Sequence, residues 1–287
     1  MGGQRCHESR LVTRHGWAWH RASSAFVDAM ASCVRANGTY ERLVWNDRRG
    51  EYVRCAEAWE TLARAATTTD DGGAFREFRG RFRLYFETDY AFLMDFVDVI
   101  ARAFASTSKY GVKRRLGEFL GAIVVGEGEI FRKSLRALWA VSPETAAAKK
   151  ETTGSLAARM SSFLRRVGDE GCFLTRIAVV AVAEGLYAGW AERASDEDVE
   201  RTSRRETTPS SDGDVDDETL FRMEQELYAK WIHPLHASEE FKEAVKDFID
   251  AFEEAWDDAD DEARARAKRA IDEMLDLEVE FTRLLEV

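Results

Sequence analysis

Over most of its length the chain repeats apolar residues every three or four positions. In an α-helix this spacing gathers the apolar side chains on one face, because the helix turns once every ~3.6 residues. Only three prolines interrupt the 287 residues, and hairpin signals flanked by alternating residues are nearly absent. The pattern predicts an all-α protein, folded as a helical bundle.

The periodic segments divide the chain into a main body and a less regular start. Helices are expected over 74–106, 112–141, 155–167, 171–194, 217–251 with a bend near Pro234, and 261–285, and two shorter ones over 23–36 and 51–66. We expect residues 1–72 to form a divergent N-terminal helical extension or insertion that packs on the bundle, and residues 73–287 to form the bundle itself. Within the bundle, the acidic stretch at 195–217 is rich in Ser, Thr and Asp, which predicts a disordered loop.

Charge and cysteine usage exclude several classes of protein. The net charge of −12 argues against a nucleic-acid partner, because phosphate binding needs a basic surface. No apolar run reaches the ~18 residues that span a membrane, which predicts a cytoplasmic protein, although the arginine-rich start leaves an organelle transit peptide open. The cysteines lack the spacing of a zinc site or a disulfide framework; they are Cys6, Cys33, Cys55 and Cys172.

Four of the predicted helices carry an acid in the middle of the apolar face. These acids are Asp89, between Phe86 and Leu93; Glu127, between Ile123 and Phe131; Glu184, between Val180 and Tyr187; and Glu278, between Leu275 and Phe281. A single such carboxylate is explained by a face edge from which it reaches water. Four of them predict a shared polar pocket, since unpaired buried carboxylates are costly.

A carboxylate-bridged dimetal site is one chemistry for such a pocket. It requires Glu-x-x-His pairs on two helices. The residues three positions after Glu127, Glu184 and Glu278 are Ile130, Tyr187 and Phe281, and the histidines lie elsewhere, at His7, His15, His20, His233 and His236. The spacing therefore disfavours a metal site, and a haem site is disfavoured further because no glycine-rich helix would let a porphyrin approach.

General acid–base catalysis on a small nitrogenous ligand is the other chemistry. Paired carboxylates can bind an amidine-like edge, protonate a leaving amine and activate water. Phe92 follows Asp89 by three residues and Tyr187 follows Glu184 by three, and aromatic side chains suit a flat ring. Ordinary core packing also explains both aromatic residues, and for Phe92 it is the preferred explanation.

Three segments resemble motifs of the TenA (thiaminase II-like) family. The segment YFETDYAFLMDF is similar to the family's Gln-Asp-x-x-Tyr-Leu helix, with Asp89 retained, Thr88 in place of glutamine and Phe92 in place of tyrosine. The segment ELYAKWIHPLHASEEF resembles its Tyr-x-x-Trp-Ile and Ser-x-Glu-Phe motifs, with Tyr228 at the matching place. The segment LDLEVEFTRLL resembles its closing Glu-x-x-Phe-Trp motif, with Glu278 matched and Thr282 replacing tryptophan.

The resemblance implies a haem-oxygenase-like bundle and hydrolysis of aminopyrimidines in thiamin salvage, without a cofactor. It implies that Asp89 binds the amidine edge of the ring, that Glu278 protonates the leaving amine and that Tyr228 holds the other side. One branch of the family has a nucleophilic cysteine at the position of Ala183. The neighbouring Glu184 looks instead like the cysteine-free, TenA-E-type branch.

We therefore expect a metal-free hydrolase that acts on an amino- or formylamino-methylpyrimidine. Its catalytic residues would be Glu184 and Glu278, and its substrate-binding residues would be Asp89, Phe92, Glu127, Tyr187 and Tyr228. Met160 and Thr282 depart from the family motifs, so a non-catalytic or regulatory protein that binds a small molecule is the alternative, and a dimetal-carboxylate oxidase on the same fold is a third. Assembly into a homo-oligomer stays open.

Overall fold

The computed structural model describes residues 38–61, apart from Arg49, Tyr52, Ala56 and Glu60, together with 73–191 and 217–285. The described elements are all helical and include no strand, which confirms the predicted all-α class. The helix expected over 23–36 and nearly all of the acidic loop expected at 195–217 lie outside the described residues. In the part of the chain that the structure describes, no helix is both long and apolar enough to cross a membrane.

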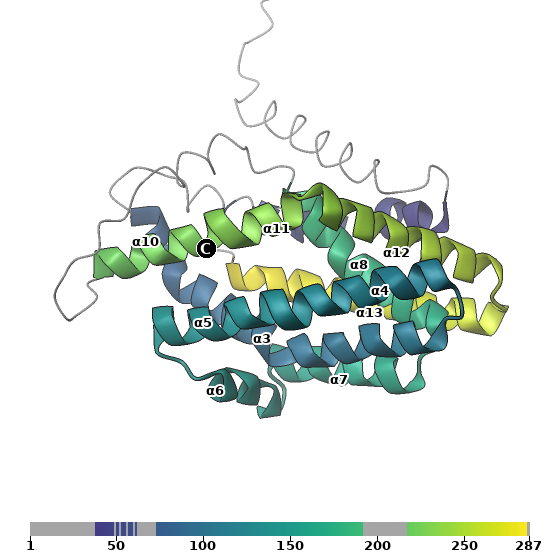
Figure 1. Ribbon diagram of the computed structural model, residues 1–287, viewed down its shortest axis with the longest axis horizontal. Helices are drawn as coiled ribbons and strands as arrows, with labels where there is room; N and C mark the ends of the chain where they lie inside the picture. Colours follow the sequence, from purple (N-terminus) through teal and green to yellow (C-terminus); the bar gives the residue numbers. More distant parts are fainter. Residues whose placement is uncertain are drawn as a thin grey trace, which may run out of the picture.

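The main body is a bundle of long helices that run roughly side by side (Figure 1). Its α-helices are α3 (Gly73–Ser106), α4 (Tyr110–Gly121), α5 (Gly128–Trp139), α6 (Pro143–Ala147), α7 (Leu156–Glu170), α8 (Phe173–Ala191), α10 (Asp217–Leu227), α11 (His233–Ala237), α12 (Glu239–Asp257) and α13 (Asp261–Thr282). Three π-helical segments, η1 (Glu41–Asn46), η2 (Ala122–Glu127) and η4 (Tyr228–Ile232), and two 3-10 turns, η3 (Ala148–Glu151) and η5 (Arg283–Leu285), complete the described elements.

Helix α8 forms the centre of the bundle. It packs along α12 and α13 and also contacts α3, which in turn packs against α7 and α4. The residues from Ile177 to Val182 are fully buried, as expected for a helix that is apolar on all sides. An acid on such a helix has no route to bulk water, so the position of Glu184 within α8 already places it inside the protein.

Serine and aspartate caps set several helix starts. The side chains of Ser142, Ser155, Ser238 and Asp260 each accept a hydrogen bond from the backbone N–H three residues ahead. The cap at Ser238 corrects the prediction of one bent helix over 217–251. Extended backbone at Ser238 (ψ 147°) separates α11 from α12, while Pro234 lies in the first turn of α11, where proline is tolerated.

The described residues before α3 are fastened to the bundle by hydrogen bonds. The backbone N–H groups of Thr39 and Tyr40 donate to the Glu253 carboxylate of α12, and the Tyr40 hydroxyl donates to the carbonyl of Ala181 in α8 (2.9 Å). Arg48 pairs with Asp272 of α13 at 3.1 Å. These contacts agree with packing on the bundle, and the division at residue 72 stays a prediction.

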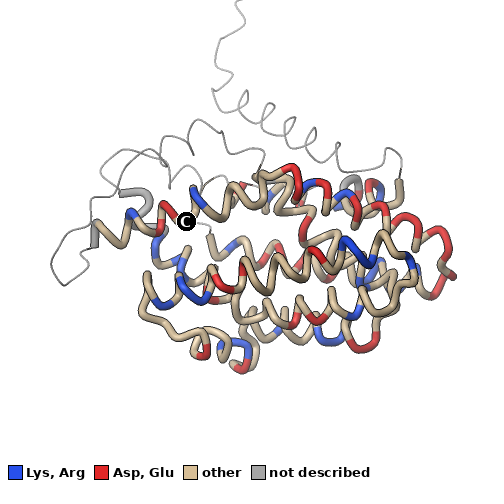
Figure 2. The backbone as a smooth tube through the Cα atoms, in the orientation of Figure 1, with Lys and Arg blue, Asp and Glu red and all other residues tan. Residues whose placement is uncertain are grey.

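Acidic and basic residues are mixed along the helices (Figure 2). Many of them pair one turn apart, as Arg114 does with Glu118. Exposed pairs of this kind contribute little to stability.

Candidate functional site

A cavity of about 350 Å³ lies within the bundle, between α3, the η2–α5 segment, α8, α11 and α13. Its wall is largely aromatic and includes Phe86, Phe92, Phe96, Phe119, Phe131 and Phe241. A cavity of this size falls in the range of small-molecule sites. Its lining contains no Lys or Arg among the described residues.

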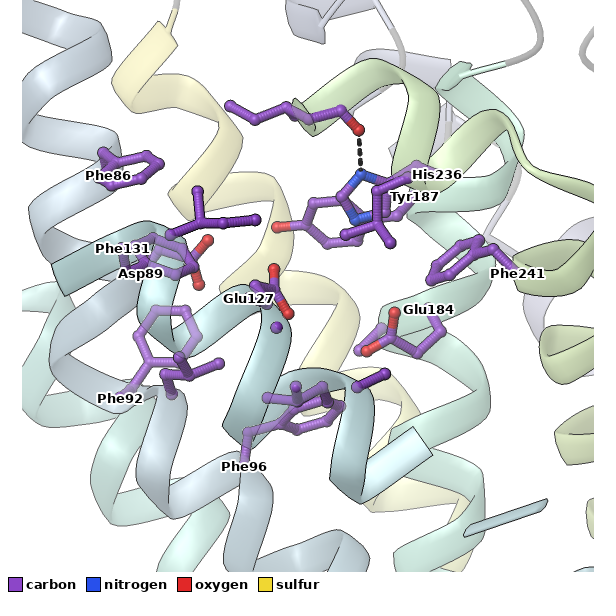
Figure 3. A pocket seen from close by; sticks show the side chains of 18 of the residues that line it. Phe86, Asp89, Phe92, Phe96, Glu127, Phe131, Glu184, Tyr187, His236 and Phe241 are labelled. Atoms are coloured by element: carbon purple, nitrogen blue, oxygen red, sulfur yellow. Dashed lines mark hydrogen bonds between the residues drawn. The ribbon is translucent and has the colours of Figure 1, made fainter. Parts of the chain in front are cut away.

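All four acids predicted on apolar helix faces line this cavity. Asp89 comes from α3, Glu127 from the end of η2, Glu184 from α8 and Glu278 from α13. In Figure 3 the carboxyl groups of Asp89, Glu127 and Glu184 point into the same space, with Glu127 between the other two in this view. The helical period therefore brought together four carboxyls that are far apart in the sequence.

None of the four carboxyls makes a hydrogen bond or an ion pair with another described residue. Other buried acids of this protein are satisfied. Glu253 accepts two backbone N–H groups, and Asp95 accepts hydrogen bonds from Ser161, Lys150 and Arg165. Glu184 and Glu278 are buried, while Asp89 and Glu127 are partly exposed. Since unsatisfied buried carboxyls are destabilising, the contrast points to a ligand as the missing partner.

Burial and mutual repulsion keep these carboxyls hard to ionise. Burial raises the pKa of Glu127 to about 7 and that of Glu278 to about 8. The pKa of Asp89 is raised well above its usual value by burial and then by the charges of Glu127 and Glu278. The pKa of Glu184 is likewise raised by burial first and by the other three acids second. The cavity therefore favours the protonated form of each acid, and Glu278, with a pKa of about 8, stays mostly protonated at neutral pH.

A π-helical segment brings Glu127 to the cavity. Phe119, Ile123, Glu127, Phe131 and Leu135 follow one another at intervals of four residues. In an α-helix each such step overshoots a full turn by ~40°, so the series would drift by roughly 160° and leave the face. The wider turn of η2 removes most of this drift, and the four apolar members are all buried.

Two tyrosines form a hydrogen-bonded pair in the wall. The hydroxyl groups of Tyr85 and Tyr187 are 2.5 Å apart, and the rings of both contact Trp59 edge-on. Tyr85 also stacks on Phe281, with 4.0 Å between ring centroids. Only Tyr187 was predicted as a site residue; Tyr85 lay on a core stripe and Trp59 in the irregular start of the chain, so no local signal marked either.

His236 is a lining residue that the sequence pattern placed away from the acids. Its ring stacks on Tyr187, with 5.0 Å between centroids, and Nδ1 lies 2.8 Å from the carbonyl oxygen of Ile232 (Figure 3). Because a carbonyl only accepts, Nδ1 carries the proton. Burial lowers the pKa of His236 to about 4, so the ring is neutral. The segment α11 that presents it is defined by η4 and by the break at Ser238, neither of which was predicted.

The remaining predicted residues divide between the wall and the core. Phe92 lines the cavity and packs edge-on against Phe281, with centroids 5.3 Å apart. Tyr228 is fully buried, packs near His233 and is not part of the lining. Six of the seven predicted site residues thus surround one cavity, and Tyr228 lies outside it.

Trp231 and Leu235 mark the mouth of the cavity. Both line it, yet 55% of Trp231 and 39% of Leu235 are exposed to solvent. Trp231 belongs to η4, and the opposite π-helical segment η2 also contributes to the lining. Two irregular helical turns therefore meet at the cavity, as is frequent at functional sites.

The residues do not form an evident metal centre. No group of three or more His, Cys, Asp or Glu side chains in the described ranges is arranged to hold a metal ion. His236 is the one histidine of the described lining, and its Nδ1 proton is engaged by a backbone carbonyl. The dimetal alternative thus gains no ligand set from the described residues.

Comparison with known proteins identifies similar sequences and folds. A profile of the TENA/THI-4/PQQC family matches residues 78–283. A search of curated proteins gave no significant match.

Solved structures with this fold are named as TenA homologues. The protein from Pyrococcus horikoshii shares 16% identity at a TM-score of 0.57, over 86% of this chain and 98% of its own. One from Pseudomonas syringae shares 13% identity at a TM-score of 0.59, over 88% and 96%. A structure from Silicibacter, titled a TenA family transcription regulator, shares 19% identity at a TM-score of 0.52, over 82% and 96%. At these identities the similarity establishes the fold.

Proposed function

Because the chain belongs to the TENA/THI-4/PQQC family, we propose that its cavity binds a small heteroaromatic amine and hydrolyses a C–N bond of an amino- or formylamino-methylpyrimidine. One observation carries the proposal. Four carboxyls without partners among the described residues surround an aromatic cavity whose described lining has no basic residue other than a neutral histidine. A flat ring with basic nitrogens supplies both the stacking surface and the missing hydrogen-bond donors.

Asp89 orients the ring in this proposal. A carboxylate accepts two parallel N–H hydrogen bonds from an amidine edge. Phe92, one turn later in α3, lines the same cavity as Asp89. A positive charge on the ring stabilises the ionised form of Asp89, which opposes the effect of burial on its pKa. Ring binding and ionisation of Asp89 therefore favour one another.

Glu184 and Glu278 act on water and on the leaving nitrogen. As the water oxygen bonds to the methylene carbon, Glu184 takes a proton from the water and Glu278 gives one to the nitrogen while the C–N bond breaks. The products are a hydroxymethylpyrimidine and ammonia. With the formylated substrate the water instead adds to the formyl carbon, and cleavage of the amide gives formate and the free amine.

The protonation states support this division of roles. A pKa of about 8 keeps Glu278 protonated at neutral pH, as a general acid must be. Glu184 has to be ionised to act as a base, although burial and three neighbouring acids raise its pKa. The positive charge of a bound substrate lowers that pKa, so substrate binding favours formation of the base.

The test measures ammonia and formate released from aminomethylpyrimidine and its formylated form. Glu184→Gln and Glu278→Gln should each lower the rate by about 10²- to 10⁴-fold, the usual range for loss of a general acid or base. Glu129→Gln is the matched control, since Glu129 lies on α5 but is exposed to solvent. Full activity in Glu184→Gln would remove that residue from the mechanism, and loss of turnover with a chelator would contradict metal-free hydrolysis.

A protein that binds the same ligand without turnover is the second candidate. It is favoured by Ala183, which the resemblance places where one branch of the family has its nucleophilic cysteine, and by the name of the Silicibacter structure, a TenA family transcription regulator. Binding of the pyrimidine without release of ammonia or formate would favour this function over hydrolysis.

A further inference from the structure

Glu127 has no task in the reaction proposed above. Asp89 holds the ring, Glu184 activates water and Glu278 protonates the nitrogen, which accounts for three of the four acids. Yet Glu127 lines the cavity without a described partner, and its backbone follows a π-helical turn that keeps it on the inner face. A carboxyl held in this way without a partner destabilises the folded protein, so we expect Glu127 to take part in ligand recognition.

Glu127 shares one wall of the cavity with Asp89. In the view of Figure 3 the Glu127 carboxyl lies between those of Asp89 and Glu184. Glu127 is the charge that most strongly raises the pKa of Asp89 and also that of Glu184. Phe86 of α3 and Phe131 of α5 pack with 4.2 Å between ring centroids and 36° between ring planes, which joins the helix that carries Asp89 to the one that follows Glu127. A ring that reaches Asp89 thus has its edge next to Glu127 as well.

The number of donors on that edge decides what the two acids can bind. A simple aminopyrimidine offers one ring nitrogen and one exocyclic amino group to this side, and a single carboxylate accepts both hydrogen bonds. The second carboxyl, Glu127, then faces the substituent on the neighbouring ring carbon. A methyl group at that position would leave Glu127 without a hydrogen-bond donor. An amino group on the carbon between the ring nitrogens would supply the missing donor.

We infer that Asp89 and Glu127 together select a heterocycle with a guanidine-like edge, that is, a ring with two exocyclic amino groups on either side of a ring nitrogen. The inference rests on the proposed function and narrows its substrate class. The pKa of about 7 of Glu127 supports it, because a nearby cationic ring favours the ionised, accepting form at neutral pH.

Two ligands that differ at one position test this selection. They are 2,4-diamino-5-(aminomethyl)pyrimidine and the 2-methyl-4-amino analogue, whose amino and methyl groups are similar in size. Calorimetry with the full 287-residue chain should show the diamino ligand bound about 10- to 100-fold more tightly, which corresponds to one hydrogen bond to a charged group.

Variants assign the preference to one side chain. Methionine is similar to glutamate in length but apolar, so Glu127→Met should reduce the ratio of the two ligand affinities to about one. Glu127→Gln should reduce this ratio partly, because a carbonyl oxygen remains. Asp89→Asn should weaken both ligands together, and exposed Glu129→Gln should change neither. Circular dichroism checks that each variant is folded. The ratio of the two ligand affinities measured on one variant does not depend on what fraction of that sample is active.

The outcomes separate this inference from the proposed function. Equal binding of the two ligands, or a preference that survives in folded Glu127→Met, overturns the inference and leaves pyrimidine binding intact. If neither ligand binds the unmodified protein, this result contradicts both the proposed function and the inference.

Discussion

At the scale of single residues, the same helix carries two acids with opposite surroundings. Asp95 of α3 accepts hydrogen bonds from Ser161, Arg165 and Lys150, and these outweigh burial and lower its pKa. Asp89, less than two turns earlier, makes no hydrogen bond or ion pair with another described residue, and its pKa is raised. Asp95 connects α3 to α7 and to the η3 turn, whereas Asp89 has no described partner and faces the cavity.

Exchanging each aspartate for asparagine should therefore change stability in opposite directions. A lowered pKa means that Asp95 stabilises the fold above pH ~4 and that this contribution is lost on acidification, so Asp95→Asn should lower the melting temperature at pH 7.5. A raised pKa means that ionised Asp89 opposes folding, so Asp89→Asn should leave the melting temperature equal or higher. A lower value for Asp89→Asn than for Asp95→Asn would contradict this account.

Ionisation of Glu278 should destabilise the folded state, so the proposed general acid also lowers stability at high pH. Since its folded pKa is raised from 4.5 to about 8, the folded state binds the proton more tightly, and stability falls as pH rises from ~4.5 to ~8. Glu278→Gln should remove this loss and raise the melting temperature at pH 8.5 more than at pH 5.

The same group should limit activity at high pH. The dependence of kcat/KM on pH should decline near pH 8, where Glu278 loses the proton that it donates. Substrate hydrolysis measured between pH 5 and 10 in a buffer series of constant ionic strength checks this. A flat profile through pH 9 would remove Glu278 as the general acid.

At the scale of elements, the π-helical segment η2 sets the position of Glu127 along its helix. Deleting Val125, which is 75% exposed, should restore regular α-helical turns while the flanking buried residues keep their faces. The deletion moves Glu127 along the axis by about 1.5 Å relative to the residues before it. Helical content and melting temperature should persist, and ligand affinity should fall at least tenfold by calorimetry.

Two alternatives to this outcome are informative. A deletion variant that unfolds would show that η2 stabilises the bundle rather than the site. Unchanged affinity for the pyrimidine would show that the bulge does not position Glu127.

The sequence alone predicted what depends on local spacing. Helical periodicity identified the long helices and the face of each acid, and those faces meet because each buries its apolar stripe in one core. Tyr85 looked like an ordinary core residue, since its hydrogen bond to Tyr187 joins residues 102 positions apart. His236 was missed because a proline was expected to bend the helix, whereas the break comes from the cap at Ser238.

At the scale of the whole molecule, the chain before α3 completes both the core and the site. Glu253 of α12 receives the N–H groups of Thr39 and Tyr40, and Trp59, farther along the same segment, lines the cavity. The bundle of 73–285 is therefore not the whole of the site, although the matched family region begins at residue 78.

Removing this attachment should loosen the segment and weaken ligand binding. Glu253→Ala leaves two backbone donors without their acceptor, which should lower the free energy of unfolding by about 1–3 kcal/mol. The neighbouring Glu254→Ala is the control, because Glu254 is exposed and pairs with Lys109 at the surface. Urea denaturation and calorimetry measure the two effects, and equal behaviour of the two variants would contradict the role of Glu253.

The lack of lysine and arginine in the described cavity lining has a consequence for measurement. Because the pKa values of the cavity acids are raised, binding of a cationic ligand should release a proton from one of them to the solvent, so ligand binding should be coupled to proton release. Apparent affinity should then rise with pH until the ligand itself becomes neutral. The heat of binding should differ among buffers by the heat that each buffer releases on taking up that ion.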